Sequence, residues 1–475
     1  MEAELKIAPD FELDPKILRA YDIRGVVGDG LDADACYAVG RAFGTMVIRN
    51  ITGTSVVVGY DGRETSPTFA TALRQGLMDC GLNVYDIGMG PTPMTYYGLK
   101  ELGADAAVMI TGSHSPVEFN GIKMALRTGP FYGEEVQTIG KLVSKQDFED
   151  GEGRAEKVDI SAKYLERILS DLNMKRPLKV AWDAGNGAAG VLLKRLTDQL
   201  PGAHFLLHEE VDGTFPNHHP DPTIEENLVD LQNCVLDNEC DIGIGFDGDA
   251  DRIGIVGPTG VIYWADTLMA VYAAEVLSTH PGAPIIADVK SSRVLFDEIE
   301  RLGGKPVMVQ TGHSILKDNI NKLRAPLGGE LSGHICFADK YYGFDDGLYC
   351  AIRLLNLISA AENGIVTLTE HLPHMFSTPE VRIHVPEDRK FEIPKQIGDM
   401  VKEEGIAKVN DMDGIRVTSE AGWWLLRASN TESVLSLRVE SFTEDGLQIL
   451  KHQLEDHLKS VGIDFAFHEE EFNSL

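Results

Sequence analysis

Three carboxylates at alternate positions suggest metal chemistry more directly than any other part of this sequence. They lie in Asp247-Gly-Asp-Ala-Asp-Arg252, directly after the apolar run Asp241-Ile-Gly-Ile-Gly-Phe246. Behind a buried strand, three such charges repel one another unless a cation lies between them. Mg²⁺ prefers oxygen ligands of this kind, usually together with phosphate oxygens. We therefore expect Asp247, Asp249 and Asp251 to bind Mg²⁺ rather than to form a solvated acidic turn.

Two other interpretations of the acidic loop predict different chemistry. An EF-hand Ca²⁺ loop is excluded, because its glycine position is Arg252 and its terminal glutamate position is Pro258. A metal-dependent phosphatase or mutase with Asp247 as the nucleophile and Asp249 as the acid stays open. Enzymes of that kind usually carry Thr or Val where this chain has Asp251, which weakens that interpretation.

A serine in a second loop is a candidate nucleophile. Ser113 lies in Thr111-Gly-Ser-His-Ser-Pro116, after the apolar run Ala106-Ala-Val-Met-Ile110. The loop is not the G-x-S-x-G elbow of α/β-hydrolases, because Ser115 stands where the second glycine is needed. Considered alone, the hexapeptide fits an ordinary turn at least as well as a catalytic loop.

Two further loops carry groups that bind hydroxyls and phosphate. Gly329-Glu-Leu-Ser-Gly-His334 offers Glu330 and Ser332, which can exchange hydrogen bonds with sugar hydroxyls. Arg427-Ala-Ser-Asn-Thr431 supplies a guanidinium, short polar side chains and backbone amides, which are the parts of a phosphate site. Each segment also fits a capped turn when it is considered alone.

The first three loops follow strands that recur in three similar units. Each unit begins with a buried strand that ends at an aspartate, and a helical stretch, a later strand and a polar loop follow. Alternating strands and helices predict parallel α/β layers, in which ligands gather at the carboxyl ends of the strands. The three loops are therefore expected to face one site. The first strands and their aspartates are Ser55–Tyr60 with Asp61, Leu178–Trp182 with Asp183 and Pro284–Ala287 with Asp288.

The last hundred residues follow a different pattern. Thr378–Val385 and Ser433–Val439 alternate as strands do, and Leu447, Leu450, Leu454 and Leu458 form a helical stripe after them. This pattern predicts a separate α+β domain. The predicted domains are 1–155 with the serine loop, 156–260 with the acidic loop, 261–370 with the sugar-binding loop and 371–475 with the phosphate-binding loop.

Composition narrows the class of protein. The 475 residues carry a formal net charge of −31, which argues against binding to nucleic acid or to an anionic membrane. No apolar run approaches the roughly 18 residues of a membrane span, and the acidic segment 1–10 is unlike a secretory signal. Six scattered cysteines without a CxxC pair fit reduced thiols. We therefore expect a cytoplasmic protein.

Together and in this order, the four loops resemble the α-D-phosphohexomutase family, most closely its bacterial phosphomannomutase/phosphoglucomutase branch. The resemblance runs from about residue 15 to the end of the chain. It implies an α/β fold with three similar mixed-sheet α/β/α domains and a C-terminal α+β domain around a central cleft. Further matching stretches are Arg19–Gly25, Asp212–Pro222, Thr311–Ser314 and Gly343–Gly347.

The resemblance also implies an activity. It is reversible phosphoryl transfer between C1 and C6 of mannose or glucose phosphates, through a phosphoserine and a hexose 1,6-bisphosphate that also serves as the activator. One Mg²⁺ per chain is the implied cofactor. A phosphoglucosamine mutase of the same family is an alternative. Hexose phosphates are the expected partners, with no nucleic acid or membrane, and we expect a monomer or a weak homo-oligomer.

Roles for individual residues follow from the resemblance. Ser113 is implied to be the phosphoserine and, with the three aspartates, a metal ligand. Lys123 and Arg24 are implied to stabilise the transferring group, and His313 is a candidate general acid or base. His114 and Arg252 match other active-site positions. Implied substrate contacts are Tyr21, Lys290, Glu330, Ser332, His334, Arg427, Ser429, Asn430 and Thr431.

The chain departs from the family pattern at three positions. Ser115 stands where Asn is usual, Ala250 where Gly is common and Glu432 where a small polar residue is common. None of these changes removes a ligand or the nucleophile. Glu432 places a carboxylate beside the expected phosphate site and is expected to weaken phosphate binding.

Overall fold

The first unit of the fold contains the serine loop. The computed structural model describes residues 8, 11–405, 407–429, 433–467 and 473–474. A short 3₁₀ turn, η1 (Pro15–Ile17), precedes the first sheet. Its strands are β1 (Ile23–Val27), β2 (Gly30–Leu31), β3 (Ser55–Tyr60), β4 (Asn83–Met89), β5 (Ala106–Ile110), β6 (Phe119–Leu126), β7 (Gly129–Pro130) and β8 (Ala155–Lys157). Its helices are α1 (Ala33–Ile51), α2 (Ser66–Asp79), α3 (Thr92–Glu101) and α4 (Glu134–Lys145).

The second unit contains the acidic loop. Its strands are β9 (Leu178–Asp183), β10 (Gly202–Leu207), β11 (Ile242–Phe246), β12 (Ile253–Val256) and β13 (Ile262–Tyr263). Its helical segments are α5 (Ser161–Leu169), α6 (Gly190–Thr197), η2 (Glu225–Leu228) and α7 (Val229–Asp237). Every residue of β11 is buried, as expected for an apolar strand covered on both faces.

The third unit contains the loop with Glu330. Its strands are β14 (Pro284–Asp288), β15 (Lys305–Val309), β16 (Leu327–Gly329) and β17 (Ile335–Phe337). Its helices are α8 (Ala265–Thr279), α9 (Arg293–Arg301), α10 (His313–Leu323), α11 (Gly347–Ala360) and α12 (Ile365–Thr369).

These three sheets share one four-stranded core. Each core has three parallel strands followed by an antiparallel strand, in the order β4-β3-β5-β6, β10-β9-β11-β12 and β15-β14-β16-β17. The second strand of each core, β3, β9 or β14, ends at one of the predicted aspartates or directly before it. The third strand, β5, β11 or β16, is followed by one of the predicted polar loops. The expectation of three similar mixed-sheet α/β/α units is confirmed.

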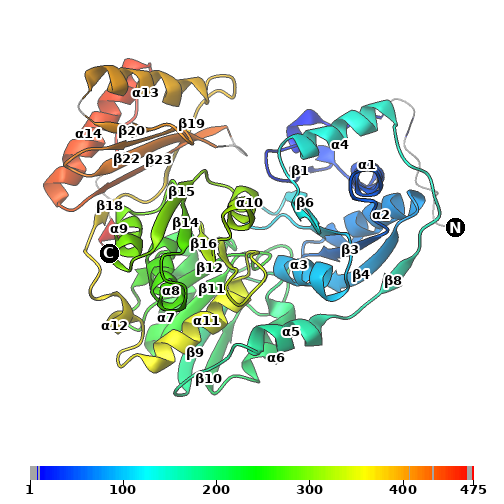
Figure 1. The fold of residues 1–475 in the computed structure, drawn as a ribbon, viewed down its shortest axis with the longest axis horizontal. Helices are drawn as coiled ribbons and strands as arrows, with labels where there is room; N and C mark the ends of the chain where they lie inside the picture. The colour runs from blue at the N-terminus through cyan, green and yellow to red at the C-terminus, as the bar shows by residue number, and fades with distance from the viewer. Residues whose placement is uncertain (1–7, 9–10, 406, 430–432, 468–472, 475) are drawn as a thin grey trace.

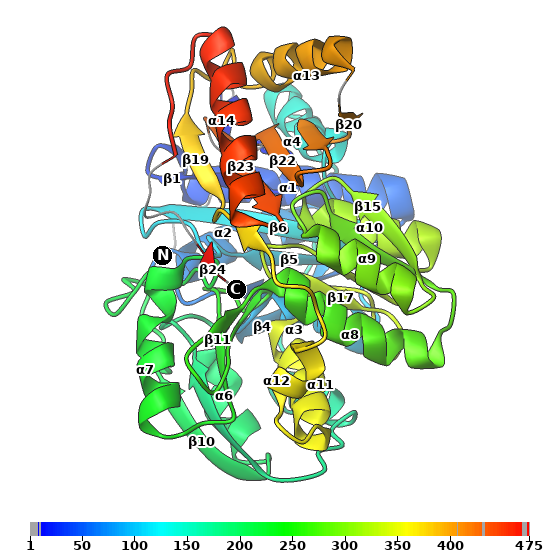
Figure 2. The same cartoon turned by 90° about the vertical axis from the view of Figure 1, so that its left-hand side faces the viewer.

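The fourth unit is an antiparallel sheet with two helices on one face (Figures 1 and 2). Its strands are β18 (Phe376–Ser377), β19 (Val381–His384), β20 (Lys408–Asn410), β21 (Ile415–Thr418), β22 (Trp423–Ala428), β23 (Val434–Ser441) and β24 (Asn473–Ser474). The helices α13 (Glu392–Glu404) and α14 (Glu444–Ser460) pack on it, which confirms the predicted α+β unit.

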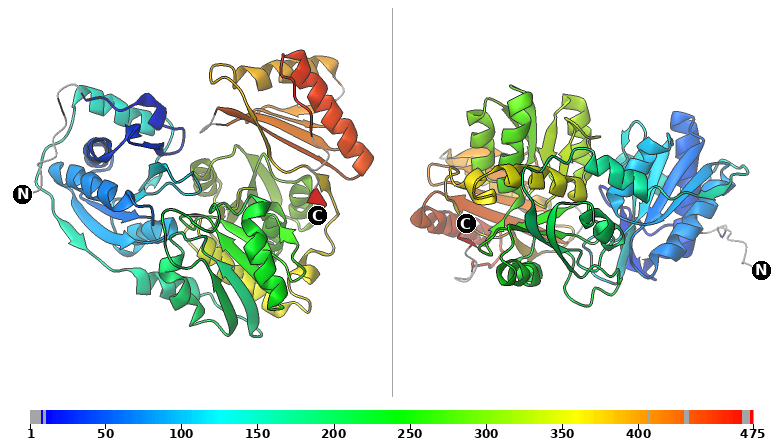
Figure 3. Two further views of the ribbon diagram at one scale, coloured as in Figure 1. Left: turned by 180° about the vertical axis from the view of Figure 1, so that it is seen from behind. Right: turned by 90° about the horizontal axis from the view of Figure 1, so that it is seen from below.

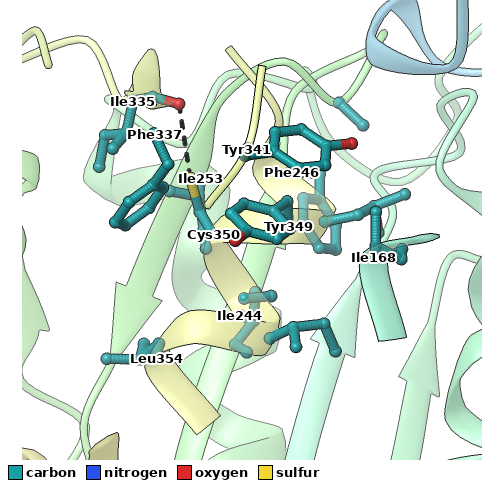
Figure 4. Packing of buried hydrophobic residues seen from close by; sticks show 14 of the residues in the cluster. Ile168, Ile244, Phe246, Ile253, Ile335, Phe337, Tyr341, Tyr349, Cys350 and Leu354 are labelled. Carbon is teal, nitrogen blue, oxygen red and sulfur yellow. Dashed lines mark hydrogen bonds between the residues drawn. The ribbon is translucent and has the colours of Figure 1, made fainter. Parts of the chain in front are cut away.

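The units differ in how their cores connect. One hydrophobic core runs through parts of the first three units, whereas the fourth has its own. Figure 4 shows Tyr349, Cys350 and Leu354 of α11 packed beside residues of β11, β12 and β17. Seen from behind, the first and fourth units lie at opposite ends of the molecule (Figure 3). The first three units are therefore joined by apolar packing as well as by polar contacts.

The predicted domain limits stay predictions. β8 lies across the predicted limit at residue 155 and pairs with β4 of the first sheet. β13 lies just beyond the limit at residue 260 and pairs with β12 of the second sheet.

Candidate active site

The serine loop is fixed from within its own unit. Asp61, at the end of β3, accepts a hydrogen bond from the Gly112 backbone N–H at 3.1 Å. Arg63 is buried, and its guanidinium donates to the loop carbonyls of Ser113, Pro116 and Phe119 at 2.9, 2.7 and 2.8 Å. A single guanidinium thus holds the loop at several points along its backbone.

Ser113 itself has an unusual backbone. Its φ of 48° lies in the left-handed region, which few residues other than glycine adopt. Its hydroxyl donates to Asp247 Oδ2 at 2.8 Å, and His114 Nδ1 lies 3.0 Å from the same Oγ. Arg24 donates to the Gly112 carbonyl at 3.1 Å and to Ser115 Oγ at 2.7 Å. Ser115, the departure from the family pattern, therefore still takes part in a polar contact.

The acidic loop lies directly against the serine loop. A Cβ at Gly248 would be 2.4 Å from the Ser113 carbonyl oxygen, so the two backbones approach in a way that only glycine allows. One oxygen from each of Asp247, Asp249 and Asp251 lies within 4.8 Å of the others, and all three side chains are buried. The structure thus brings the predicted nucleophile and the three predicted ligands together.

Lys123 fills part of this carboxylate cluster. Its Nζ lies 2.7 Å from Asp249 Oδ2 and 2.5 Å from Asp251 Oδ2. Burial alone would lower the pKa of Lys123, but Asp249 and Asp251 raise it well above its ordinary value. The lysine is therefore charged, and its ammonium lies among the carboxylates that are predicted to bind the metal.

One lysine leaves the carboxylates undercompensated. Burial, with Asp249 and Asp251 nearby, raises the pKa of Asp247 well above its ordinary value. Asp249 Oδ1 is buried and has no hydrogen-bond partner among the described residues. A buried carboxylate oxygen without a hydrogen-bond partner, in a cluster of carboxylate oxygens, is suited to bind a hard cation. The residues present therefore fit a hard divalent cation such as Mg²⁺.

Ala250 adopts the conformation for which the family commonly has glycine. Its φ is 55°, and the residue is fully buried inside the acidic loop. A left-handed backbone costs an L-residue roughly 1–2 kcal/mol. The departure noted in the sequence therefore strains the loop without removing a ligand.

The third loop joins the acidic loop through a chain of charged groups. His334 lies between Glu330 Oε2 and Asp251 Oδ1, with ring nitrogens 3.1 Å from each. Burial opposes its charge, but the neighbouring Asp251 and Glu330 raise the pKa of His334 to about 9. Ser332 Oγ donates to Glu330 Oε2 at 3.1 Å. Arg252, paired with His334 in an isolated bridge, completes the junction.

Two aromatic rings lie beside this junction. The His313 ring stacks on His334 with centroids 5.5 Å apart, and the Tyr21 ring meets His313 edge-on at 6.4 Å. The Tyr21 hydroxyl donates to the Thr311 carbonyl at 2.7 Å. Lys317 Nζ lies 3.1 Å from His313 Nδ1. Because an ammonium only donates, His313 Nδ1 accepts and the ring proton is on Nε2.

The remaining predicted contacts lie where the third and fourth units meet. Lys290 Nζ is 2.9 Å from Glu380 Oε2, and Arg427 Nε is 3.1 Å from Asp413 Oδ2. Ser429 is buried directly after β22, the strand that contains Arg427. Asn430, Thr431 and Glu432 lie outside the residues that the structure describes.

Sequence reasoning missed several residues that hold the site. Thr92 Oγ1 donates to Asp249 Oδ2 at 2.5 Å, and Asp413 accepts from the Thr311 backbone at 3.0 Å. Asp345 is fully buried, 2.9 Å from Lys317. Arg63 could have been suspected from its position two residues after Asp61, whereas nothing in the sequence marks Thr92.

Four consecutive matches decide the family. Residues 15–150, 162–260 and 264–376 match the α/β/α domains I, II and III described as phosphoglucomutase/phosphomannomutase, and 380–457 match the C-terminal domain of that description. This chain belongs to the phosphoglucomutase/phosphomannomutase family. The predicted resemblance is thereby confirmed.

Relatives in the phosphoglucomutase/phosphomannomutase family cover nearly the whole chain. A Pseudomonas aeruginosa phosphomannomutase/phosphoglucomutase is 43% identical over 94% of this chain and 96% of its own length. A Neisseria meningitidis phosphoglucomutase is 39% identical over 94% and 97%. A solved Burkholderia thailandensis family protein superposes with a TM-score of 0.90 at 40% identity, over 96% of this chain and all of that one.

These matches favour the hexose phosphate mutase over the alternatives left open by the sequence. Family membership counts against an aspartyl phosphatase, and the 43% identical relative has a mutase name. In the part of the chain that the structure describes, no helix combines the length and apolarity needed to cross a bilayer.

Proposed function

We propose that this chain interconverts the 1- and 6-phosphates of glucose and mannose through phospho-Ser113. The observation that carries the proposal is the contact between Ser113 Oγ and Asp247 Oδ2 at 2.8 Å, at the edge of a buried carboxylate cluster. A serine hydroxyl in that position can receive a phosphoryl group whose charge is neutralised by Lys123 and by a cation held in the cluster. The names of the relatives support the same substrates.

Two transfers complete the reaction. The free hydroxyl of a sugar monophosphate attacks phosphorus on phospho-Ser113, the P–Oγ bond breaks, and a hexose 1,6-bisphosphate forms. In net terms the hydroxyl proton replaces the phosphoryl group on Ser113 Oγ. The bisphosphate then turns end over end, and its other phosphoryl group returns to the serine. Such transfers depend mainly on positioning and charge neutralisation.

Named side chains have distinct tasks in this proposal. Asp247, Asp249, Asp251 and an oxygen on Ser113 would hold one Mg²⁺, which when bound neutralises charge on the phosphoryl group. Lys123 and Arg24 stabilise the same group. His313, with its proton on Nε2, is better suited to donate a hydrogen bond than to act as a base.

The cofactor proposal is tested by chelation. Excess chelator is expected to abolish turnover, and Mg²⁺ is expected to restore it. Ca²⁺ should restore it poorly, because its larger and less regular coordination misplaces the phosphoryl group. Full activity in excess chelator would show that the acidic loop acts without a metal.

Sugar selectivity follows from the need to bind the sugar in two orientations. Glucose and mannose differ only at C2, and a half-turn roughly exchanges O3 with O4. Glu330 and Ser332 are suited to grip O3 and O4 and to leave O2 loosely contacted. The proposal predicts kcat/KM values for the two sugars within about tenfold, or roughly 1.4 kcal/mol.

A substrate panel tests this selectivity. The enzyme, supplied with a hexose 1,6-bisphosphate activator, is assayed on glucose, mannose, galactose and glucosamine phosphates. Galactose phosphate, with axial O4, should be used much less well, because its O4 would point away from Glu330 and the sugar would lose that charged hydrogen bond. A strong preference for glucosamine phosphate, or equal use of galactose phosphate, would contradict this assignment of the third loop.

A further inference from the structure

A second group of possible metal ligands lies in the second domain, outside the site described above. One ligand atom from each of Asp183, His208 and His218 lies within 4.8 Å of the others. Leu207 at the end of β10 pairs with Asp183 at the end of β9, so His208 and Asp183 emerge at the same edge of the sheet. Asp183 is 2% exposed, and the two histidine side chains are 16% and 14% exposed. The group is thus built into the fold and not assembled from mobile surface chains.

The hydrogen bonds of His218 leave a place for a cation. Its Nδ1 is 3.0 Å from the His219 carbonyl oxygen, which only accepts, so Nδ1 carries a proton. Its Nε2 is 3.0 Å from Asp183 Oδ2, which is also an acceptor. A neutral His218 would therefore set two acceptors face to face, and either a second proton or a metal ion must lie between them. An Nδ1–H bound to a backbone carbonyl is also how proteins orient a ligating histidine through Nε2.

The charges around the group also call for a cation. His208 Nε2 lies 3.0 Å from Asp230 Oδ2, which brings a second carboxylate to the group. Among the described residues, neither Asp183 nor Asp230 forms an ion pair with a lysine or an arginine. Asp230 is 51% exposed and is solvated, whereas Asp183 is buried and accepts the Gly185 backbone N–H at 2.8 Å besides its contact with His218. A buried carboxylate without a lysine or arginine partner is costly, which applies here to Asp183. The two imidazoles can compensate it only by taking up protons or by sharing a metal ion.

We propose that Asp183, His208 and His218 bind a divalent transition-metal ion of the Zn²⁺ class. Imidazole and carboxylate together suit Zn²⁺, whereas Mg²⁺ prefers oxygen ligands alone, so this site and the acidic loop would select different metals. Ligands about 2.1 Å from a tetrahedral Zn²⁺ are about 3.4 Å apart. His218 Nε2 and Asp183 Oδ2, at 3.0 Å, would have to separate by a few tenths of an ångström. The His208 ligand atom lies within 4.8 Å of both and would have to move closer where it is farther away than the tetrahedral spacing. Asp230 or water would take the fourth position.

A metal ion bound at this site would stabilise a segment that contacts both the acidic loop and the arginine that holds the serine loop. The turn after Asp183 donates from the Ala188 N–H to the Gly248 carbonyl at 2.9 Å, directly behind the acidic loop. The segment after His208 places the Phe215 ring 5.2 Å from the guanidinium of Arg63, which holds the serine loop. We therefore expect the metal to raise thermal stability and to leave the chemical step unchanged.

Metal binding is best tested with His208→Asn. His208 has a φ of 51°, and Asn is one of the few residues that tolerate a left-handed backbone, so the change removes the imidazole without new strain. In saturating Mg²⁺, equilibrium dialysis against micromolar Zn²⁺ should load one Zn²⁺ per wild-type chain. The variant should bind at least tenfold more weakly. His452→Asn, at an exposed helix position, is the matched control and should bind as the wild type does.

A second variant separates this site from the acidic loop. Asp249→Asn should lose Mg²⁺-dependent turnover and still bind the Zn²⁺ ion, with the same rise in melting temperature as the wild type. The proposal is overturned if wild-type protein takes up no Zn²⁺ in saturating Mg²⁺, or if His208→Asn binds it equally well. It is also overturned if Zn²⁺ binding disappears in Asp249→Asn, which would place the ion in the acidic loop.

Discussion

The first and third domains hold equivalent loops in different ways. Asp61 follows β3, and Asp288 is the last residue of β14. Each accepts a backbone N–H from the loop that follows the neighbouring parallel strand, which is β5 in the first domain and β16 in the third. Gly112 and Leu331 are the donors, at 3.1 Å in both cases. Beyond this shared contact, Arg63 binds carbonyls of the serine loop from within its own domain. The third loop instead depends on charged side chains that reach into the second domain.

This difference fits what each loop has to do. The serine must stay in place through both transfers, and contacts to the backbone do not compete with the substrate. The sugar must bind in two orientations and leave, so its loop needs side chains that can exchange one partner for another. Glu330 and His334 already satisfy each other before a sugar arrives. A hydroxyl can therefore replace one hydrogen bond without exposing an unpaired charge.

The largest effect is expected from removing the nucleophile that the first loop positions. Ser113→Ala should lower turnover by at least roughly 10³-fold, because no oxygen remains to carry the phosphoryl group. Mass analysis should find phosphate on Ser113 in the wild type. Ser115→Ala is the control and should keep that phosphate. Full activity of Ser113→Ala together with a phosphoaspartate at Asp247 would favour the aspartyl mechanism.

A smaller loss is expected when the serine stays and its backbone clamp is removed. Arg63→Met deletes the hydrogen bonds to the loop carbonyls, so the nucleophile is misplaced while the sugar contacts remain. We expect kcat to fall about 10²-fold with little change in KM. Steady-state kinetics on one sugar phosphate measures both values. Arg293→Met, which removes a half-exposed arginine paired with Asp297, is the matched control. An unchanged kcat in Arg63→Met would mean that Asp61 alone is sufficient.

The third loop should respond in KM instead of kcat. Glu330→Gln removes a charged hydrogen-bond acceptor worth about 1.5–3 kcal/mol, so KM should rise by roughly tenfold or more. A fall in kcat without a change in KM would show that the third loop acts in the transfer step and does not mainly bind the sugar. Ser332→Ala, which deletes a neutral hydroxyl, should have the smaller effect.

The same substitution should shift the titration of His334. Asp251 and Glu330 raise its pKa to about 9 in the folded chain, above its ordinary value of about 6.5. The stabilisation from its charge is therefore complete below pH 6.5 and is lost as the pH rises through 9. In Glu330→Gln the loss should occur at lower pH. Histidine-resolved NMR titration of the metal-free protein measures this, and an unchanged pKa would show that Glu330 does not hold the charge.

The smallest expected effect is on stability and comes from a substitution in the acidic loop, which is the loop of the second domain equivalent to the two compared above. Ala250→Gly relieves a left-handed conformation and should raise the free energy of unfolding by up to about 1 kcal/mol. Ala189→Gly is the control, because Ala189 has a φ of −56° and glycine there should destabilise. Thermal melts of both variants decide the matter, and a loss of stability in Ala250→Gly would show that its Cβ packs usefully.

The sequence pattern predicted the loops better than the contacts between them. The alternate spacing of the aspartates in the acidic loop indicates a metal site, and the repeat predicts that three strand ends meet. Nothing local shows that Thr92 binds Asp249 or that His334 bridges Glu330 to Asp251, because these partners are distant in the chain and the packing of whole domains brings them together. Lys123 was assigned a task at the phosphoryl group, but its ion pairs with the acidic loop could not be foreseen.

Those ion pairs have a consequence for the order in which the protein is made. Lys123 is 3% exposed, and the carboxylates that neutralise it belong to a domain that leaves the ribosome later. Until Asp249 and Asp251 have been synthesised, the nascent first domain must either leave this ammonium in water or carry it uncompensated. Since domains generally fold as units during synthesis, the first domain should wait in an incomplete state until the second arrives. Its maturation is then tied to translation of residues more than a hundred positions downstream.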